Sequence, residues 1–137
     1  MSNYVGKRIK SIDVFYETQH EDGVQIILSD GTEVLFTMAN GQYCCEDWGY
    51  ISSIGNEDAQ NFVGAVVHDI SIVTKVNSDY ITNALDNERI DYDNAYFIRV
   101  ETDQGDLEFA VYNEHNGYYG HDVRLKIGND KVVDSRL

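Results

Sequence analysis

The sequence predicts an α+β domain in which antiparallel β-sheet dominates and the one or two helices are short. Segments rich in β-branched and aromatic residues recur along the chain, separated by glycine and Asn/Asp turn signals. Proline is absent, so no strand interior carries a residue that cannot donate to a sheet ladder. No helical pattern is long enough to form the crossover of a parallel sheet. With 137 residues, 42% of them hydrophobic, the chain is expected to form a single domain over residues 1–137.

The N-terminal part predicts an antiparallel meander. Residues 8–16 contain alternating apolar side chains, and residues 24–28 and 32–38 are rich in β-formers. Glu21-Asp22-Gly23 is interpreted as a turn. Ser29-Asp30-Gly31 is interpreted as a hairpin turn, because Asp-Gly readily adopts the positive φ that tight hairpins require. The three strands are therefore expected to be neighbours in one sheet.

The middle of the chain mixes strand and helix signals. A short strand is expected over residues 50–54, directly after a Tyr-rich segment. A helix of about two turns is expected over 56–64, with Asn56 as its cap and Gly64 as its end. The β-branched run over 65–76 predicts another strand.

The C-terminal part begins with a polar stretch over 77–94. A polar stretch of this length predicts an irregular segment that is functional or mobile, with a short helix around 79–86 as the alternative. Three further strands are predicted over residues 96–102, 107–112 and 122–127, with a turn at 103–106 between the first two.

The charge balance excludes some classes of partner. The formal net charge is -14, and only ten basic residues are scattered along the chain. Nonspecific binding to nucleic acid or to an anionic membrane needs clustered Lys and Arg, so neither is expected. A small anionic ligand remains compatible, because one pocket needs only one or two arginines. No apolar run reaches the ~18 residues of a membrane helix and no signal-peptide core is present, which indicates a cytoplasmic protein.

Two Tyr-rich segments, 42–50 and 113–121, have the composition of an exposed recognition surface. Each combines aromatic residues, glycine and hydrogen-bonding side chains. In the second segment, Asn116-Gly117 is typical of a turn between two strands. The same turn can present Tyr118 and Tyr119 as stacking faces and the Asn116 amide as a reader of a base edge. The segment can form a turn between two strands and serve as a recognition surface at the same time.

An enzyme hypothesis is available from residue types alone. Cys45 with His121 or His115, oriented by Glu46 or Asp122, would supply a nucleophile, a base and an orienting group. No spacing rule joins these residues. The expectation is therefore a protein that is not an enzyme, with the Cys45/His121 hydrolase left open as the alternative.

No metal or cofactor is expected. Cys44 and Cys45 are adjacent and lack the C-x₂-C spacing with which two cysteines usually chelate one ion. Glu88, Asp91 and Asp93 lie in an acidic stretch, but the calcium-loop pattern is not present there. This acidic stretch is expected to be a solvated loop without a bound ion.

Two motifs together resemble a small phage and prophage family long listed as a domain of unknown function. The first is Gln42-x-Cys44-Cys45-Glu46, followed by an isoleucine-rich stretch, a short helix and Val63-Gly64. The second is Asn116-Gly117-Tyr118-Tyr119 before the final strand. The family pattern is Q-x-C-C-E and later S-N-G-Y-Y-S after a tryptophan. This chain has His115 and Gly120 at the two serine positions and no tryptophan before the second motif.

Phage proteins of this size and build are similar to the Thoeris anti-defence sponges. Those proteins bind cyclic ADP-ribose isomers made by bacterial TIR-domain enzymes, do not cleave them, and so disarm the host effector. The resemblance implies a phage anti-defence protein that sequesters a nucleotide signal in the host cytosol. Such a ligand needs an aromatic side chain for stacking, an arginine for phosphate and amides or carboxylates for ribose hydroxyls. The candidate ligand-binding residues come from the C-terminal hairpin region, where both arginines are expected to reach the same side of the Asn116-Gly117 turn. They are Arg99 or Arg124 for phosphate, Tyr118 or Tyr119 for stacking, and Asn116 and Phe97.

A rival hypothesis is an acidic interaction protein that inhibits a host protein and has no small-molecule ligand. High acidity would suit docking on a basic host surface or mimicry of nucleic acid. On either hypothesis a homo-oligomer, at least a dimer, is expected, because open antiparallel sheets leave edge strands that must be paired, covered or charged.

Overall fold

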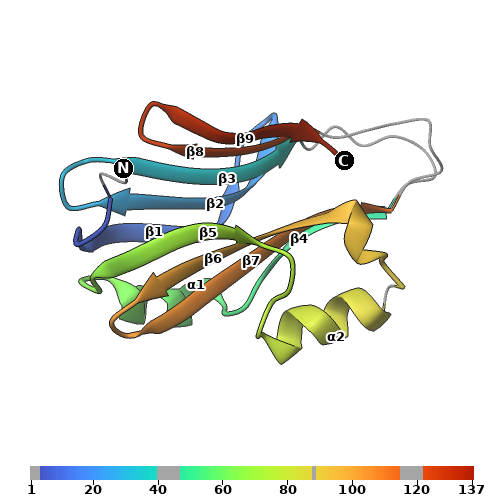
Figure 1. Cartoon of the computed structure of the whole chain (residues 1–137), viewed down its shortest axis with the longest axis horizontal. Helices are drawn as coiled ribbons and strands as arrows, with labels where there is room; N and C mark the ends of the chain where they lie inside the picture. Colours follow the sequence, from blue (N-terminus) through green and yellow to red (C-terminus); the bar gives the residue numbers. More distant parts are fainter. Residues whose placement is uncertain (1–3, 40–46, 88, 115–121) are drawn as a thin grey trace.

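The computed structural model describes residues 4–39, 47–87, 89–114 and 122–137, which fold into two antiparallel sheets stacked as two layers (Figure 1). The five-stranded sheet contains β1 (Ile9–Glu17), β2 (Glu21–Leu28), β3 (Glu33–Ala39), β8 (Asp122–Ile127) and β9 (Asp130–Arg136), in that order. The four-stranded sheet contains β4 (Asp47–Ser52), β7 (Gly105–Glu114), β6 (Ala95–Thr102) and β5 (Val67–Val73), in that order. The predicted α+β class dominated by antiparallel sheet is confirmed.

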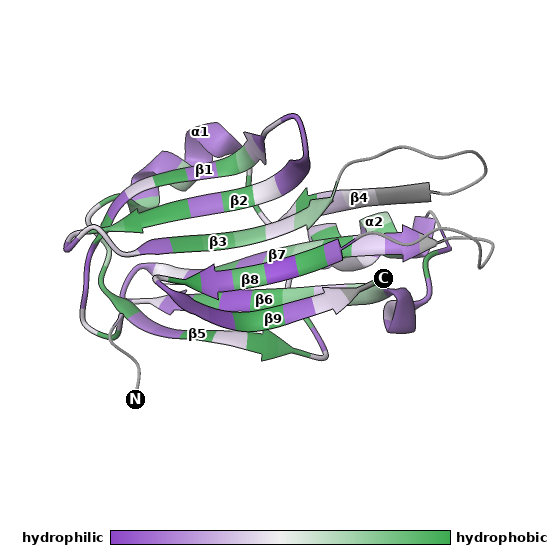
Figure 2. Ribbon diagram, turned by 90° about the horizontal axis from the view of Figure 1, so that it is seen from above, coloured by the Kyte–Doolittle hydropathy of each residue, from purple (hydrophilic) through white to green (hydrophobic). Residues whose placement is uncertain are grey.

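The hydrophobic core lies between the two layers. Along each strand, hydrophobic and hydrophilic residues tend to alternate (Figure 2), because successive side chains of a strand point to opposite faces. Phe36 of β3 and Phe109 of β7 are fully buried in one cluster with side chains from both sheets. Because every described strand supplies its inward side chains to this cluster or to its margin, the two sheets stabilise each other by burying apolar surface.

The predicted meander is confirmed as β1-β2-β3, but its first turn lies elsewhere. Residues 21–23 belong to β2, which pairs with β3 from Glu21 onward. A Cβ atom at Gly23 would lie 2.0 Å from the carbonyl oxygen of Phe36, so this glycine permits a close approach of two strands. The turn itself is made by Thr18, whose hydroxyl accepts hydrogen bonds from the backbone N–H groups of His20 (3.1 Å) and Glu21 (3.0 Å).

The short helix after β4 covers the outer edge of β1. It consists of α1 (Asn56–Ala59) and the 3₁₀ turn η1 (Gln60–Phe62), which is slightly shorter than the predicted 56–64. Asn56 is not the cap, because Gly55 occupies that position. Instead, the Asn56 side chain accepts from the Val14 N–H (3.3 Å) and the Gln60 amide donates to the Ile12 carbonyl (3.0 Å). These bonds satisfy edge groups that would otherwise remain open for pairing.

The polar stretch after β5 folds into a helix that covers the outer face of the four-stranded sheet. The helix α2 (Asp79–Asn87) lies below that sheet in Figure 1, and the 3₁₀ turn η2 (Tyr92–Asn94) follows it. Ile81 and Leu85 of α2 are fully buried against Phe97 and Ala110 of the sheet. The expectation of an irregular segment over 77–94 is therefore corrected, and the alternative of a helix around 79–86 is confirmed.

The C-terminal strand β9 was not predicted. It pairs with β8 and places Ser135 where its hydroxyl accepts from the Tyr96 hydroxyl (2.9 Å). The Asn113 amide donates to the Leu137 carbonyl (3.1 Å), which joins the end of β9 to the other sheet.

The strand β5 is also shorter than the predicted 65–76. Within the described ranges, no helix is long and apolar enough to cross a bilayer.

Candidate ligand-binding site

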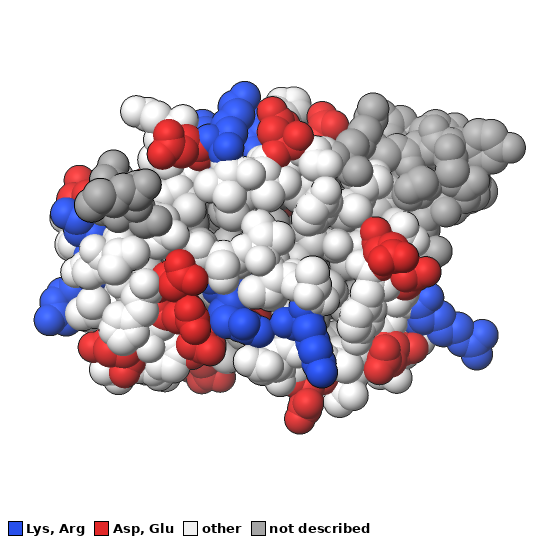
Figure 3. Space-filling view, viewed as in Figure 1, with Lys and Arg blue, Asp and Glu red and all other residues white. Residues whose placement is uncertain are grey.

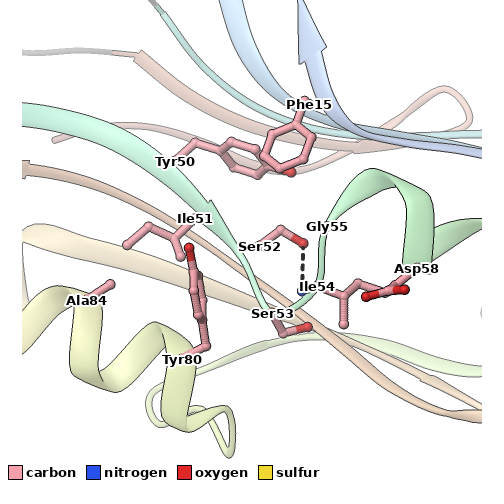
Figure 4. Close-up of a pocket in the computed structure, with 10 residues that line it drawn as sticks. All are labelled: Phe15, Tyr50, Ile51, Ser52, Ser53, Ile54, Gly55, Asp58, Tyr80 and Ala84. Carbon is pink, nitrogen blue, oxygen red and sulfur yellow. Dashed lines mark hydrogen bonds between the residues drawn. The ribbon is translucent and has the colours of Figure 1, made fainter.

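A cleft of about 380 Å³ opens where β4, α1, α2 and the end of β1 come together (Figure 4). Its volume falls within the range of small-molecule pockets, ~300–1,000 Å³, at the lower end. Most of the lining is apolar or aromatic, and a few hydroxyl groups and one carboxylate are placed among these side chains. The lining residues are Phe15, Tyr50, Ile51, Ser52, Ser53, Ile54, Gly55, Asp58, Tyr80 and Ala84.

The cleft follows the open edge of β4, the outermost strand of its sheet. Tyr50 is opposite Val111 and Ser52 is opposite Phe109, so both side chains point toward the inner face. Ile51 is opposite Ala110 and points toward α2. The Ser53 N–H donates to the Glu108 carbonyl of β7 (2.9 Å). Along an antiparallel strand, every second residue directs its backbone N–H and C=O groups toward the same neighbour. The backbone groups of Tyr50 and Ser52, which alternate with Ser53, therefore point away from β7. The cleft therefore combines side chains from both faces of the strand with backbone groups that point away from β7.

Aromatic rings form two walls of the cleft. The rings of Phe15 and Tyr50 meet edge to face, with centroids 6.2 Å apart and an interplanar angle of 83°. Tyr80 comes from the first turn of α2, and 66% of it is exposed. In Figure 4 its ring stands beside Ile51 with one face open to the cleft. An exposed aromatic face of this kind is a stacking surface for a flat ligand.

The Tyr50 hydroxyl is buried and has no hydrogen-bond partner among the described residues. Burial raises the pKa of Tyr50 far above its ordinary value, and the negative charge of Asp13 adds to the rise. The Ser52 hydroxyl nearby offsets part of this effect on the pKa, although no bond of good geometry joins the two groups. Tyr50 therefore stays protonated at physiological pH and keeps a hydrogen-bond donor that its own fold does not use.

Two serine hydroxyls lie between the aromatic walls. Ser52 Oγ accepts from the Ile54 N–H (3.3 Å), as the dashed line in Figure 4 shows. Ser53 Oγ accepts from the Glu108 N–H (3.1 Å). Ser52 is buried beside Tyr50, whereas Ser53 is partly exposed. Because the Ser53 oxygen is fixed by a backbone donor, the Ser53 hydroxyl proton is directed elsewhere and is available to a ligand acceptor. At the far end of the cleft stands Asp58, and among the described lining residues it is the single charged side chain.

Arg99, a predicted phosphate ligand, has protein partners in this structure. Its guanidinium forms an ion pair with Glu108 (3.0 Å) and donates to the Lys75 carbonyl (3.0 Å). The Glu108 carboxylate also accepts from the backbone N–H groups of Asn77 (2.9 Å) and Ser78 (2.7 Å), at the start of α2. The structure therefore shows the salt bridge that is the ordinary alternative for a strand arginine in an acidic protein.

Arg124, the second predicted phosphate ligand, lies in a different part of the molecule. It lines a cavity of about 190 Å³ together with His20, Glu21, Ala39 and Asp122. Its Nε is buried and finds no hydrogen-bond partner in the described part of the chain. Two carboxylates share this cavity, so an entering phosphate would meet repulsion as well as attraction.

The two arginines do not converge on one site. Val123 and Leu125 flank Arg124 and are buried in the core, so Arg124 points out of the five-stranded sheet. Ile98 and Val100 flank Arg99 in the same way, so Arg99 points out of the four-stranded sheet. One small ligand cannot contact both side chains in one chain, which corrects the expectation that they reach the same side of a shared turn.

Phe97 is also not available as an open stacking face. It is buried under α2, where its ring meets Tyr92 edge to face with centroids 5.6 Å apart. The other predicted ligand-binding residues, Asn116, Tyr118 and Tyr119, lie outside the described residues. The Cys45/His121 pair and the Gln42–Glu46 motif also lie outside them. Within the described ranges, no group of three or more His, Cys, Asp and Glu side chains is arranged to hold a metal ion.

Comparison with known proteins places the chain in a family. Residues 2–125 match the model of a family described as "Domain of unknown function (DUF7448)". The chain belongs to this family. No curated protein and no solved structure matches it. In this DUF7448 member, the geometry of the cleft is therefore the main guide to function.

The sequence contained a signal for part of this site that was not used. Ile81 and Leu85 are four residues apart, which marks one buried side of a helix. Tyr80 and Ala84 have the same spacing and must share a neighbouring face, which is the face that lines the cleft. No local pattern relates Tyr80 to Phe15 or Asp58, because these residues are brought together only by the packing of the two sheets and α2.

Proposed function

We propose that this DUF7448 member is a phage-type anti-defence protein that binds a cyclic ADP-ribose-type nucleotide signal in the host cytosol and retains it without cleavage. The observation that carries the proposal is the aromatic cleft with its unused hydroxyl donors. The likeness of phage proteins of this size and build to the Thoeris anti-defence sponges supplies the class of ligand.

The lining chemistry supports retention of a flat ligand. Tyr80 offers an open ring face, and Ile51 and Ala84 supply apolar contact beside it. Ser53 can donate a hydrogen bond from a fixed position, since its oxygen is held by the Glu108 N–H. Apolar walls with a few placed polar groups are typical of small-molecule sites. Each of these groups binds a ligand and none requires a bond of the ligand to break.

The direct test is recovery of the nucleotide after binding. The purified protein is incubated with the product of a TIR-domain enzyme, separated from free nucleotide, heated and analysed by chromatography. We expect depletion of the nucleotide from solution and release of the intact molecule on heating. Release of a converted nucleotide would make the protein an enzyme, and no depletion would reject the proposal.

A matched pair of variants shows whether Arg124 takes part. If the phosphates of the ligand reach this guanidinium, Arg124→Ala weakens binding by ~1.5–3 kcal/mol, the scale of a charge-assisted hydrogen bond. Lys126→Ala is the control, because Lys126 lies two residues along β8 on the same outer face. Equal affinity of the two variants and the unaltered protein would exclude Arg124 from the site.

The second candidate is an acidic interaction protein that inhibits a host protein. The net charge of -14 favours it, because such a charge attracts a basic partner surface. On the face seen in Figure 3, however, Asp and Glu side chains are interspersed with Lys and Arg and form no continuous acidic area. Pull-down from host lysate at low and high salt separates the two candidates. A stoichiometric protein partner that is lost at high salt would favour this second function, because salt screens exposed charges.

A further inference from the structure

We propose that the cleft holds the base of the nucleotide, that this base is of the adenine type with an exocyclic amino group, and that it stacks on Tyr80 with the amino group toward Asp58. This inference rests on the proposed function and deepens it. It assigns the uncharged ring part of the ligand to the cleft and places the phosphates outside it.

Stacking is assigned to Tyr80 because its ring is more exposed than that of Phe15, which packs edge to face against Tyr50. Tyr80 is 66% exposed although its neighbour Ile81 is fully buried, so the fold does not use the Tyr80 ring for packing. The ring stands at one end of the cleft, with Ser52 and Ser53 between it and Asp58 (Figure 4). A base lying against Tyr80 therefore extends its edge over the serines toward the carboxylate. Stacking on an aromatic side chain suits any base, so the edge must supply the selectivity.

The charge of the lining selects an amino group and excludes phosphate. Asp58 supplies a carboxylate, and no Lys or Arg is found among the described residues that line the cleft. A phosphate placed here would meet a negative charge with no compensating cation. An exocyclic amino group is a hydrogen-bond donor, and a carboxylate accepts such bonds strongly. Asp58 therefore favours an amino-bearing base over one with a carbonyl oxygen at the same position.

The hydroxyl groups complement the ring nitrogens of such a base. Ser53 is partly exposed, and its proton is free to reach an acceptor because its oxygen already accepts from the Glu108 N–H. The unused Tyr50 hydroxyl lies deeper, beside the ring of Phe15, which is 53% exposed. The site thus offers donors to ring nitrogens and an acceptor to the amino group, which matches the edge of adenine.

The test compares three ligands by isothermal titration calorimetry, namely adenosine, inosine and adenosine monophosphate. Inosine has a carbonyl oxygen where adenosine has the amino group, so it presents lone pairs to Asp58. We expect adenosine to bind at least about tenfold more tightly than inosine, the scale of one hydrogen bond to a charged group. Adenosine monophosphate should bind no more tightly than adenosine, because its phosphate has no partner in the cleft.

Two variants of Tyr80 and one control examine the stacking. Tyr80→Ala should weaken adenosine binding about fivefold or more, whereas Tyr80→Phe should retain it because the ring face is kept. Tyr92→Ala removes another exposed tyrosine, one that lies outside the cleft, and should leave binding unchanged. Thermal unfolding of each variant verifies that the fold is intact.

The outcomes separate this inference from the proposed function. Recovery of an intact cyclic ADP-ribose-type nucleotide by a protein that binds no adenosine would overturn the inference and leave the function standing. Equal affinity for adenosine and inosine would overturn the assignment of the amino group to Asp58. Equal losses in Tyr80→Ala and Tyr92→Ala would overturn the assignment of stacking to Tyr80. If neither adenosine nor the intact nucleotide binds, the inference and the proposed function both fail.

Discussion

At the scale of single residues, the clearest feature is a buried carboxylate that joins the sheet to α2. Glu108 is 3% exposed, forms an ion pair with Arg99 and accepts from two backbone N–H groups before the helix. Its partners satisfy a charge that would be costly to bury alone. Arg99 is therefore structural in this chain, whatever it adds to ligand binding.

The first prediction follows from this ion pair. Arg99→Ala should lower the free energy of unfolding by ~3–5 kcal/mol, because it leaves the buried Glu108 carboxylate without its counter-charge. The measurement is urea unfolding followed by circular dichroism. The control is Lys131→Ala, which breaks an exposed pair with Asp134 and should cost only ~0–1 kcal/mol. Similar losses in the two variants would show that Glu108 does not depend on Arg99.

The second prediction concerns Tyr50 and pH. The unfolded chain releases the Tyr50 proton near the ordinary value of 10.0, whereas burial raises the pKa of this hydroxyl in the folded protein. At alkaline pH the unfolded state therefore binds fewer protons than the folded state. The free energy of unfolding is unaffected by this group below pH 10 and falls as the pH rises above 10. Tyr50→Phe removes this dependence. At neutral pH we expect the variant to be at least as stable as the unaltered protein, because the substitution removes a buried hydroxyl that has no partner among the described residues. At alkaline pH the difference in melting temperature should grow in favour of the variant. Identical alkaline curves would contradict the burial of this hydroxyl.

At the scale of elements, strand pairing was easier to predict than the roles of particular residues. The alternation over 8–16 and the Asp30-Gly31 signal are local, and they located β1, β2 and β3 correctly. Gly23 was interpreted as a turn residue because Glu-Asp-Gly is a common turn pattern. Its actual role depends on the backbone of Phe36 and Thr37 across the sheet, which no local pattern contains. The helix α2 had a local signal in Ile81 and Leu85, but the polar composition of the stretch hid it.

The third prediction tests the role of Gly23. Gly23→Ala should destabilise the fold by about 3 kcal/mol or more, because the new Cβ would overlap the backbone of β3. Gly55→Ala is the matched control, since Gly55 has φ of -74° and open space around it. Chemical unfolding of both variants gives the comparison. A Gly23→Ala protein as stable as the control would mean that β2 and β3 are not packed so closely.

At the scale of the whole molecule, the sequence indicated one antiparallel sheet and the chain forms two. The division was hidden because β3 pairs with β8, a strand from the other end of the chain, rather than with the next strand. The candidate site was hidden for the same reason, since Phe15, Asp58 and Tyr80 come from three separate elements. Long-range pairing of this kind depends on packing energy summed over the fold and leaves little trace in any one segment.

The fourth prediction is oligomerisation through an edge strand. The edge of β1 is covered by Asn56, Gln60 and the bridge from Arg8 to Val66, whereas β9 is the last strand of its sheet. Val132 of β9 is 51% exposed, and an exposed apolar edge favours pairing with a second copy. Light scattering at micromolar concentration should give at least a dimer of the 15.6 kDa chain. Val132→Lys should shift the mass toward the monomer, because a charge opposes edge pairing. Val63→Lys is the control and should leave the mass unchanged, because Val63 is exposed but lies outside any strand. A monomeric mass for the unaltered protein would reject the prediction, and a dimer that survives Val132→Lys would place the contact on another surface.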